Sequence, residues 1–243
     1  MASRKSFGGK VTWLGHAAFL IESPKGVRVA LDPFIEHNPK FPKGFDYGKV
    51  DVIAATHGHS DHFGEDGIHL AKKTRATVVG IYEIGLFAGS HGIEKTSGMN
   101  KGGSQKVAGV EFRMVAADHS AGAAGQGGVV YTGEPCGYVM TFEDGFRIYH
   151  AGDTNVFSDM ALIGELYAPD LALLPIGDFY TMGPREAAKA CELLGVPRVI
   201  PMHWGTFPVL VGTPDALRKE LSARMVSTEV VELAPGDSWP RRN

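Results

Sequence analysis

The sequence predicts an α/β protein with helices and strands in layers. The chain opens with short β-rich runs separated by turn residues, and from Val50 onward apolar runs alternate with helical patterns. The composition is also ordinary for a globular protein, with 44% hydrophobic and 21% charged residues. A chain of 243 residues can bury one core of this kind, so we expect residues 1–243 to form a single domain.

The first strands are expected between Val11 and Leu31. Two β-rich runs there are separated by Ser23-Pro24-Lys25-Gly26, which has the composition of a turn, so the chain should open as an antiparallel meander. Farther along, apolar runs predict buried strands at residues 52–55, 78–79, 110–115, 146–149, 171–174 and 199–200.

Two helices are predicted in the second half of the chain. One runs from about Pro184 to Leu194, because apolar residues recur there at helical spacing, proline stands at the start and Gly195 follows the end. The other begins after Thr213, which is suited to cap a helix N-terminus, and it should turn Leu217 and Leu221 inward.

Two long segments are predicted to be loops. Glu36–Gly48 is rich in proline and glycine, and Ser120–Gly137 contains six glycines. Loops of this length in a compact domain are more often functional walls or lids than neutral connections. We therefore expect both segments to border a site.

Charge and targeting signals exclude several classes of protein. The 24 basic and 27 acidic residues give a formal net charge of −3 without a basic stripe, so no nucleic-acid partner is expected. The N-terminus lacks an apolar core of signal-peptide length, and no run reaches the ~18 apolar residues of a membrane span. We expect a cytoplasmic protein with no membrane partner, and the sequence leaves a homo-oligomer open.

The two cysteines cannot form a cysteine-rich zinc module. Cys136 and Cys191 lie 55 positions apart, and neither belongs to a CxxC pair. Cys191 falls on the apolar stripe of the helix predicted from Pro184, where a small core residue is expected. Any metal must therefore be held by histidines and carboxylates.

His57, His59, Asp61 and His62 form an H-x-H-x-D-H string directly after the apolar run 52–55. A chance match is expected on the order of once in a thousand chains of this composition, so the string is a strong signal. In a tight loop leaving a strand, His57 and His59 can point to one cation while Asp61 and His62 turn to a second, and zinc accepts imidazole and carboxylate together. The string predicts two metal positions served by one loop.

Three more candidate ligands follow predicted strands. His119 comes after the run 110–117, Asp153 after 146–150 and His203 after 198–202. Sites in open α/β sheets gather outside the carboxyl ends of the strands. Any one of these residues alone would be interpreted as a core histidine or a turn aspartate, but together they predict a shared site.

These motifs resemble the signature of the metallo-β-lactamase superfamily. The matching segments are THGHSDH at 56–62, DHS at 118–120, AGDT at 151–154 and PMHWG at 201–205. LGH at 14–16, LDPF at 31–34, MNKGG at 99–103 and PIGDFYTMGP at 175–184 are similar to a branch of uncharacterised metal-dependent hydrolases related to L-ascorbate-6-phosphate lactonases. The resemblance covers about Val11 to Leu233 and implies an αβ/βα four-layer sandwich, with metals at one edge between the two sheets.

The resemblance also implies which residues hold two divalent metal ions. His57, His59 and His119 would bind the first metal, Asp61, His62 and His203 the second, and Asp153 would bridge the two. All seven positions carry the residue that the family pattern requires. Phe179 is a departure, because a polar residue is expected there, and this puts a substrate contact at that position in doubt.

The expected activity is metal-dependent hydrolysis. Two metals can lower the pKa of a bridging water to about 7, and the resulting hydroxide would attack an ester, lactone or phosphoester of a small-molecule substrate. Asp61 would be catalytic by orienting that hydroxide. Zinc is the expected metal, with manganese, nickel and iron as alternatives. Iron-dependent oxygen chemistry and a non-enzymatic role are the competing hypotheses, and metal analysis would separate them.

Five polar residues near the motifs have candidate supporting roles. Asp32 at a strand end could accept a proton from a ligating imidazole, and His16 and His150 could orient a ligand or bind substrate. Asp178 and Tyr180 are candidates for lining the pocket.

Overall fold

Two mixed β-sheets form the centre of the computed structural model, which describes residues 5–125 and 127–241. Within these residues the first sheet has seven strands, in the order β16 (Ser238–Trp239), β1 (Lys10–Trp13), β2 (Phe19–Glu22), β3 (Arg28–Leu31), β4 (Val52–Ala54), β5 (Thr77–Ile81) and β6 (Thr96–Met99). The second sheet has seven more, in the order β15 (Glu229–Val230), β14 (Arg198–Met202), β13 (Leu171–Pro175), β12 (Arg147–His150), β11 (Cys136–Thr141), β8 (Val110–Ala116) and β7 (Ser104–Val107).

Each sheet is antiparallel in one half and parallel in the other. In the first sheet β1, β2 and β3 pair antiparallel, which confirms the predicted meander, whereas β3 to β6 pair parallel. In the second sheet β7, β8, β11 and β12 pair antiparallel, and β12 to β15 pair parallel. The predicted turn after β2 is present, since Gly26 has a φ of 82° and its N–H donates to the carbonyl of Ser23.

Alternating side chains of the second sheet face two different apolar layers. On β11, Tyr138 and Met140 pack in a core shared with the first sheet, whereas Val139 packs with the helices. On β13, Leu173 faces the first sheet and Leu174 faces the helices. This period of two is what a strand buried on both faces requires. The two sheets share one core, and a single domain stays a prediction.

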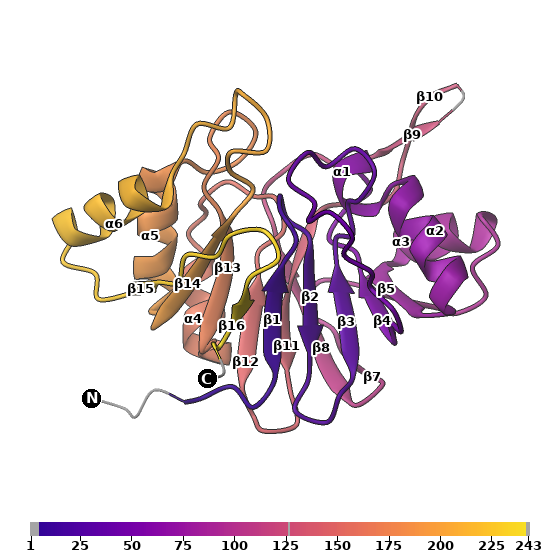
Figure 1. Ribbon diagram of the computed structural model, residues 1–243, viewed down its shortest axis with the longest axis horizontal. Helices are drawn as coiled ribbons and strands as arrows, with labels where there is room; N and C mark the ends of the chain where they lie inside the picture. The colour runs from indigo at the N-terminus through magenta and orange to yellow at the C-terminus, as the bar shows by residue number, and fades with distance from the viewer. Residues whose placement is uncertain (1–4, 126, 242–243) are drawn as a thin grey trace.

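Helices cover the outer face of each sheet (Figure 1). On one side lie α1 (Ser60–Phe63), α2 (Glu65–Thr74) and α3 (Tyr82–Ser90), and on the other α4 (Met160–Tyr167), α5 (Pro184–Leu194) and α6 (Pro214–Ala223). The order helices, sheet, sheet, helices confirms the predicted αβ/βα four-layer sandwich. No helix among the described residues is long and apolar enough to cross a bilayer.

The two predicted helices have the expected ends. α5 stops at Gly195, which adopts a left-handed φ of 59° as a C-cap. α6 is capped by Thr213, whose side chain accepts a hydrogen bond from the N–H of Ala216. Leu217 and Leu221 are buried as predicted, and so is Cys191 on α5.

One loop prediction is confirmed and the other is wrong in part. Residues 36–48 contain no helix or strand. Ser120–Gly137, by contrast, contains a β-hairpin made of β9 (Ala123–Gly125) and β10 (Gly128–Val130), and its last two residues already belong to β11. Glycines hide the strand pattern here, because backbone pairing rather than an apolar face holds the hairpin together.

Candidate metal centre

The seven predicted ligands gather at one edge of the sandwich. The H-x-H-x-D-H string follows β4 and enters α1, while His119, Asp153 and His203 follow β8, β12 and β14. The sheets thus deliver side chains from four strand ends to one place, as the strand-end argument requires. The structure brings all seven into three overlapping groups of donor atoms, and within each group these atoms lie no more than 4.8 Å apart.

His57, His59 and His119 form the first group. Nε2 of His57 lies 3.0 Å from Nδ1 of His59, and the ring of His119 is 5.3 Å from the rings of both. His57 is buried, whereas His59 and His119 are half-buried. The group is therefore reachable from solvent on one side.

Asp61, His62 and His203 form the second group, together with His16. Nε2 of His16 is 3.0 Å from Oδ2 of Asp61, and the rings of His16 and His203 lie 3.8 Å apart. The three histidines are buried, and the side chain of Asp61 is 31% exposed. Only Asp61 in this group faces solvent to a substantial extent.

Asp153 lies between the two groups. Its Oδ2 is 3.1 Å from Nε2 of His203, 3.2 Å from Nε2 of His62 and 3.7 Å from Nε2 of His119. Its other oxygen, Oδ1, is buried and has no hydrogen-bond partner among the described residues. Buried polar atoms are normally paired, and a cation at this position would pair this carboxylate oxygen.

Asp32 fixes the tautomers of one histidine in each group. Its Oδ2 accepts a hydrogen bond from Nδ1 of His62 at 3.0 Å and from the hydroxyl of Thr56 at 2.7 Å. Because that hydroxyl donates to Asp32, its oxygen is left to accept from Nδ1 of His57 at 3.0 Å. His57 then carries its proton on Nδ1 and turns a bare Nε2 into the site. His62 keeps a proton on Nδ1 as well, so a metal would bind it through Nε2.

His150 supports the same carboxylate. Its Nε2 lies 3.0 Å from Oδ2 of Asp32, and both side chains are fully buried. His150 therefore does not contact the candidate ligands directly. This geometry supports the expected role of Asp32 as hydrogen-bond acceptor from a candidate ligand, His62. His150 adds one further hydrogen bond to the same carboxylate.

Backbone strain turns several of these side chains toward the site. His16, Asp32 and His203 have φ values of 54°, 40° and 54°, in the left-handed region that residues other than glycine rarely adopt. Each follows the end of a strand. Strain of this kind costs about 1–3 kcal/mol per residue and persists only when the surroundings enforce it, commonly at functional sites.

Burial and the charges of neighbouring side chains shift the pKa values of the cluster in different directions. Burial lowers the pKa of His57 well below its usual value, also lowers that of His59 and His119, and with His203 lowers that of His16 to about 4. His62 differs, because Asp153 and Asp32 outweigh its burial and raise its pKa well above the usual value. Although burial alone would raise it, the pKa of Asp153 is held well below its usual value by His203 and His62.

The donor set fits a metal. Nε2 of His57 carries no proton in the tautomer that Thr56 imposes, and Nδ1 of His59 and a carboxylate oxygen of Asp153 lie near it. Converging lone pairs repel one another unless a cation lies between them. Imidazole and carboxylate together suit zinc and other divalent transition metals.

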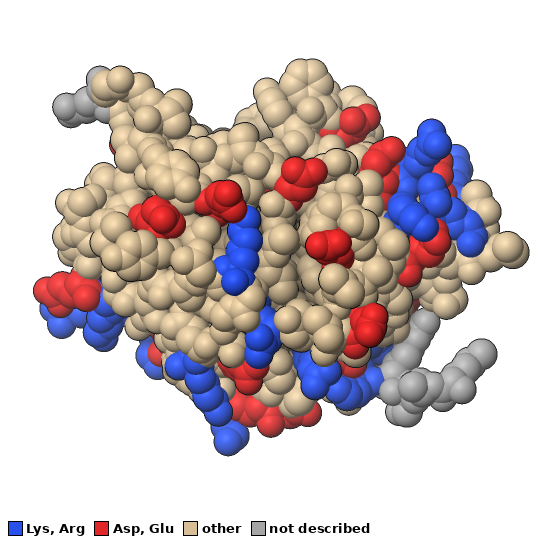
Figure 2. Space-filling model, turned by 180° about the vertical axis from the view of Figure 1, so that it is seen from behind, with Lys and Arg blue, Asp and Glu red and all other residues tan. Residues whose placement is uncertain are grey.

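Close backbone packing builds the rim of the site. A side chain at Gly58 would collide with Thr132, so the segment between β10 and β11 rests on the H-x-H segment. A side chain at Gly177 would collide with the carbonyl oxygen of His203, which places the loop before α5 against the second group. Seen from behind, the upper edge of the molecule is hollowed between the hairpin and the loops that precede α5 and α6 (Figure 2).

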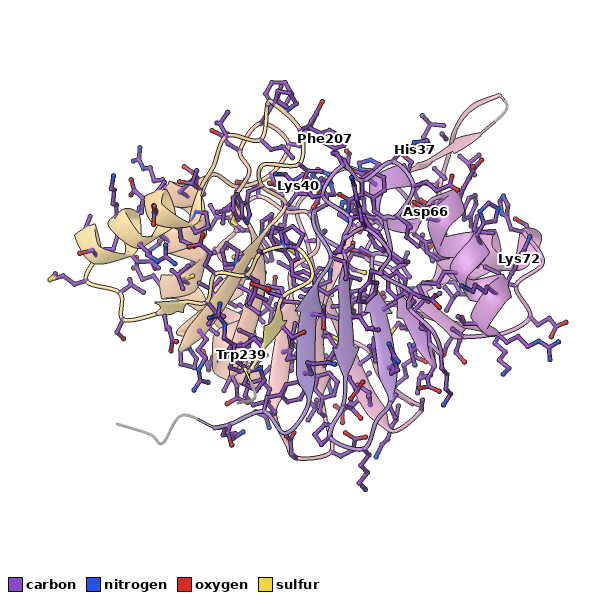
Figure 3. All side chains as sticks on the ribbon, viewed as in Figure 1. His37, Lys40, Asp66, Lys72, Phe207 and Trp239 are labelled. Atoms are coloured by element: carbon purple, nitrogen blue, oxygen red, sulfur yellow. The ribbon has the colours of Figure 1, made fainter. Side chains whose placement is uncertain are left out.

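Apolar side chains are exposed on this rim. Val129 and Tyr131 of the hairpin segment are 82% and 68% exposed, and Phe179 of the loop before α5 is 67% exposed. Phe207 packs its ring 5.7 Å from that of His16, and it lies with Lys40 at the upper end of the molecule (Figure 3). Asp178 and Tyr180 are exposed beside Phe179, and their contact with substrate stays a prediction.

Comparison with known proteins places this site in a class. The sequence model of the family described as "Beta-lactamase superfamily domain" matches residues 10–203. A two-sheet sandwich with a His/Asp cluster at the edge between the sheets is the arrangement that the resemblance implied. The chain belongs to the metallo-β-lactamase superfamily.

Within that class, the relatives point to one group. Proteins named UPF0173 metal-dependent hydrolase from Solibacter usitatus and Methanopyrus kandleri are 51% and 48% identical to this chain. The matches cover 93% and 96% of this chain and 97% and 100% of the relatives. The chain is a member of this family of metal-dependent hydrolases.

A solved structure gives the same result. Igni18, described as a novel metallo hydrolase from the archaeon Ignicoccus hospitalis, superposes with a TM-score of 0.84 at 36% sequence identity. The superposition covers 96% of this chain and 99% of Igni18. The likeness therefore extends over the complete sandwich and is not confined to the motifs.

Proposed function

We propose that this protein hydrolyses an ester, lactone or phosphoester bond of a small molecule with water activated by two divalent metal ions. The observation that carries the proposal is the convergence of seven His and Asp side chains on two adjacent positions with Asp153 between them. Zinc is the expected metal, and manganese, nickel and iron are alternatives.

The residues divide between two metal positions. His57, His59 and His119 would hold the first metal and Asp61, His62 and His203 the second, with Asp153 shared. When bound, such a pair supplies a hydroxide at neutral pH and stabilises the oxygens on which negative charge develops. This division is consistent with the distances from Asp153 to histidines of both groups.

The protein's own side chains orient the reactants. Asp61 is the most exposed carboxylate of the cluster, so it is placed to accept a hydrogen bond from the attacking water. Asp32 accepts from Nδ1 of His62, and Thr56 accepts from Nδ1 of His57, so Nε2 of each ring is the nitrogen directed into the site. The hairpin segment with Val129 and Tyr131 would form one wall of the substrate cleft.

A substrate panel tests the proposal. The purified protein, loaded separately with zinc, manganese, nickel and iron, would be assayed on lactones, phosphodiesters, thioesters and β-lactams. We expect hydrolysis of at least one oxygen ester, lactone or phosphoester, and about two metals per chain by elemental analysis. Iron retained with oxygen consumption but without hydrolysis would favour the oxidative alternative, and absence of bound metal would refute the proposal.

Metal binding at pH 7 should release the proton that His62 carries at Nε2. His62 has a raised pKa and is charged in the metal-free protein, whereas His57, His59 and His119 have lowered pKa values and are neutral. A metal at Nε2 of His62 must displace its proton, so affinity should rise with pH, by up to about tenfold per pH unit, until the pH passes that pKa.

Titration calorimetry measures this release. Binding would be followed at pH 7 in buffers of different ionisation enthalpy, and the dependence of the apparent enthalpy on the buffer gives the number of protons released. An apparent enthalpy that is identical in all buffers would contradict the charged state of His62.

A further inference from the structure

His16 lies in the second group, although the sequence pattern assigns it no metal. Its Nε2 is 3.0 Å from Oδ2 of Asp61, and one donor atom from each of His16, Asp61, His62 and His203 lies within 4.8 Å of the others. Two donors on opposite sides of a transition metal, each at about 2.1 Å, are separated by about 4.2 Å. A single cation can thus reach all four side chains after small adjustments.

The backbone holds His16 in place beside His203. The carbonyl oxygen of His16 accepts hydrogen bonds from the indole N–H of Trp13 and from the N–H of His203, both at 2.9 Å. The φ of His16 is 54°, in the left-handed region. His16 and His203 are therefore presented as a joined pair, with their rings 3.8 Å apart.

Asp61 is the hydrogen-bond partner of one ring nitrogen of His16, and the other ring nitrogen has none among the described residues. His16 is completely buried, and its Nδ1 has no hydrogen-bond partner among residues 5–125 and 127–241. Its Nε2 points at the carboxylate of Asp61, a candidate ligand. The polar contacts of the ring are therefore those made at Nε2.

We propose that His16 binds the second metal directly through Nε2, together with Asp61, His62, His203 and Asp153. The proposal rests on the proposed function only in requiring that metal binds. Five donor side chains exceed the four that zinc takes in structural sites, whereas the first position has His57, His59 and His119 with Asp153.

The two positions are then unequal. The second is nearly enclosed by protein ligands and favours metals that accept more than four donors, such as manganese. The first keeps fewer protein ligands and is partly open to solvent, so substrate approaches the first position. The second metal would thus be surrounded by protein side chains, whereas the first would be the one that substrate contacts.

The substitution His16→Asn tests the assignment. Asparagine tolerates the left-handed backbone, but its side chain is too short to replace an imidazole. Affinity for the second metal should fall more than about 100-fold, beyond the range produced by loss of a hydrogen-bond partner of a ligand. His150→Asn is the matched control, since this histidine is equally buried but contacts only Asp32 among the site residues, and less than about tenfold loss is expected.

Calorimetric titration with Mn²⁺ and with Zn²⁺, and metal content after desalting, provide the readout without any substrate. We expect about two metals per chain in the unsubstituted protein and about one in His16→Asn. A loss of 100-fold or less would assign His16 to orienting Asp61 and overturn the proposal. Because the titration needs no substrate, failure to find hydrolysis would count against the proposed function and leave this inference standing.

A structure of the unsubstituted protein loaded with Mn²⁺ settles the matter if the variant does not fold. Nε2 of His16 should then lie within about 2.5 Å of the second metal. A separation beyond about 3 Å would exclude a direct bond.

Discussion

Stripping both metals with a chelator is expected to abolish hydrolysis and to lower the melting temperature by about 10–30 °C. Each metal present at 100–1,000 times its Kd contributes about 2.7–4.1 kcal/mol of stability, and for a chain of this size 1 kcal/mol corresponds to about 2–4 °C. Without a cation, the ring nitrogens of the cluster face the buried carboxylate of Asp153 and one another. Loss of the metal thus removes a stabilising charge from the edge shared by both sheets.

Differential scanning calorimetry before and after chelation measures this effect, with metal content determined on the same samples. Adding zinc back should restore both the melting temperature and the activity, which separates metal loss from irreversible damage. An unchanged melting temperature in protein shown to be metal-free would contradict the prediction.

Replacing Asp61 by asparagine should lower kcat by about 100–1,000-fold, the range seen when one group that stabilises developing charge is removed. The side chain of Asp61 is 31% exposed, compared with 3% for Asp153, so Asp61 is the carboxylate that can reach the attacking water. A neutral amide keeps the shape of the side chain but is a poor ligand and a weaker acceptor. We expect turnover to fall by a larger factor than metal content.

Steady-state kinetics and metal analysis of the same preparation test whether turnover falls more than metal content. Asp51→Asn is the control, because Asp51 lies at the opposite end of β4, where it accepts a hydrogen bond from the N–H of Arg28. Its kcat should stay within about twofold of the unsubstituted protein, as expected for a position outside the site. If Asp61→Asn loses metal and activity in equal proportion, Asp61 is a ligand without a further role.

The strand ends explain how much of the site could be predicted. The H-x-H-x-D-H string is local, and His119, Asp153 and His203 each stand just after an apolar run, so the chain itself shows that they leave strands. Parallel strands bring their carboxyl ends to the same edge, and this rule gathers the four segments without knowledge of the contacts. Their assignment as ligands stays a prediction, although the structure brings them together.

The hairpin β9–β10 shows where pattern reasoning fails. Its strands are short and rich in glycine and alanine, with no alternation of apolar and polar residues, so the segment looked like a loop. Local backbone pairing forms the hairpin, and Thr132, which follows it, packs on Gly58. A side-chain pattern cannot report an element whose side chains are mostly exposed or absent.

The sequence by itself determined the layered α/β class, the two helices with their caps and the set of seven candidate ligands. These features are encoded by neighbours in the chain, through periodicity, turn residues and spacing. The tertiary structure alone decided that Asp32 accepts from both His62 and His150, the latter 118 positions away, and that His16 lies beside His203. Such contacts arise when strands from two sheets meet at one edge, and residue spacing carries no record of which strand ends will face each other.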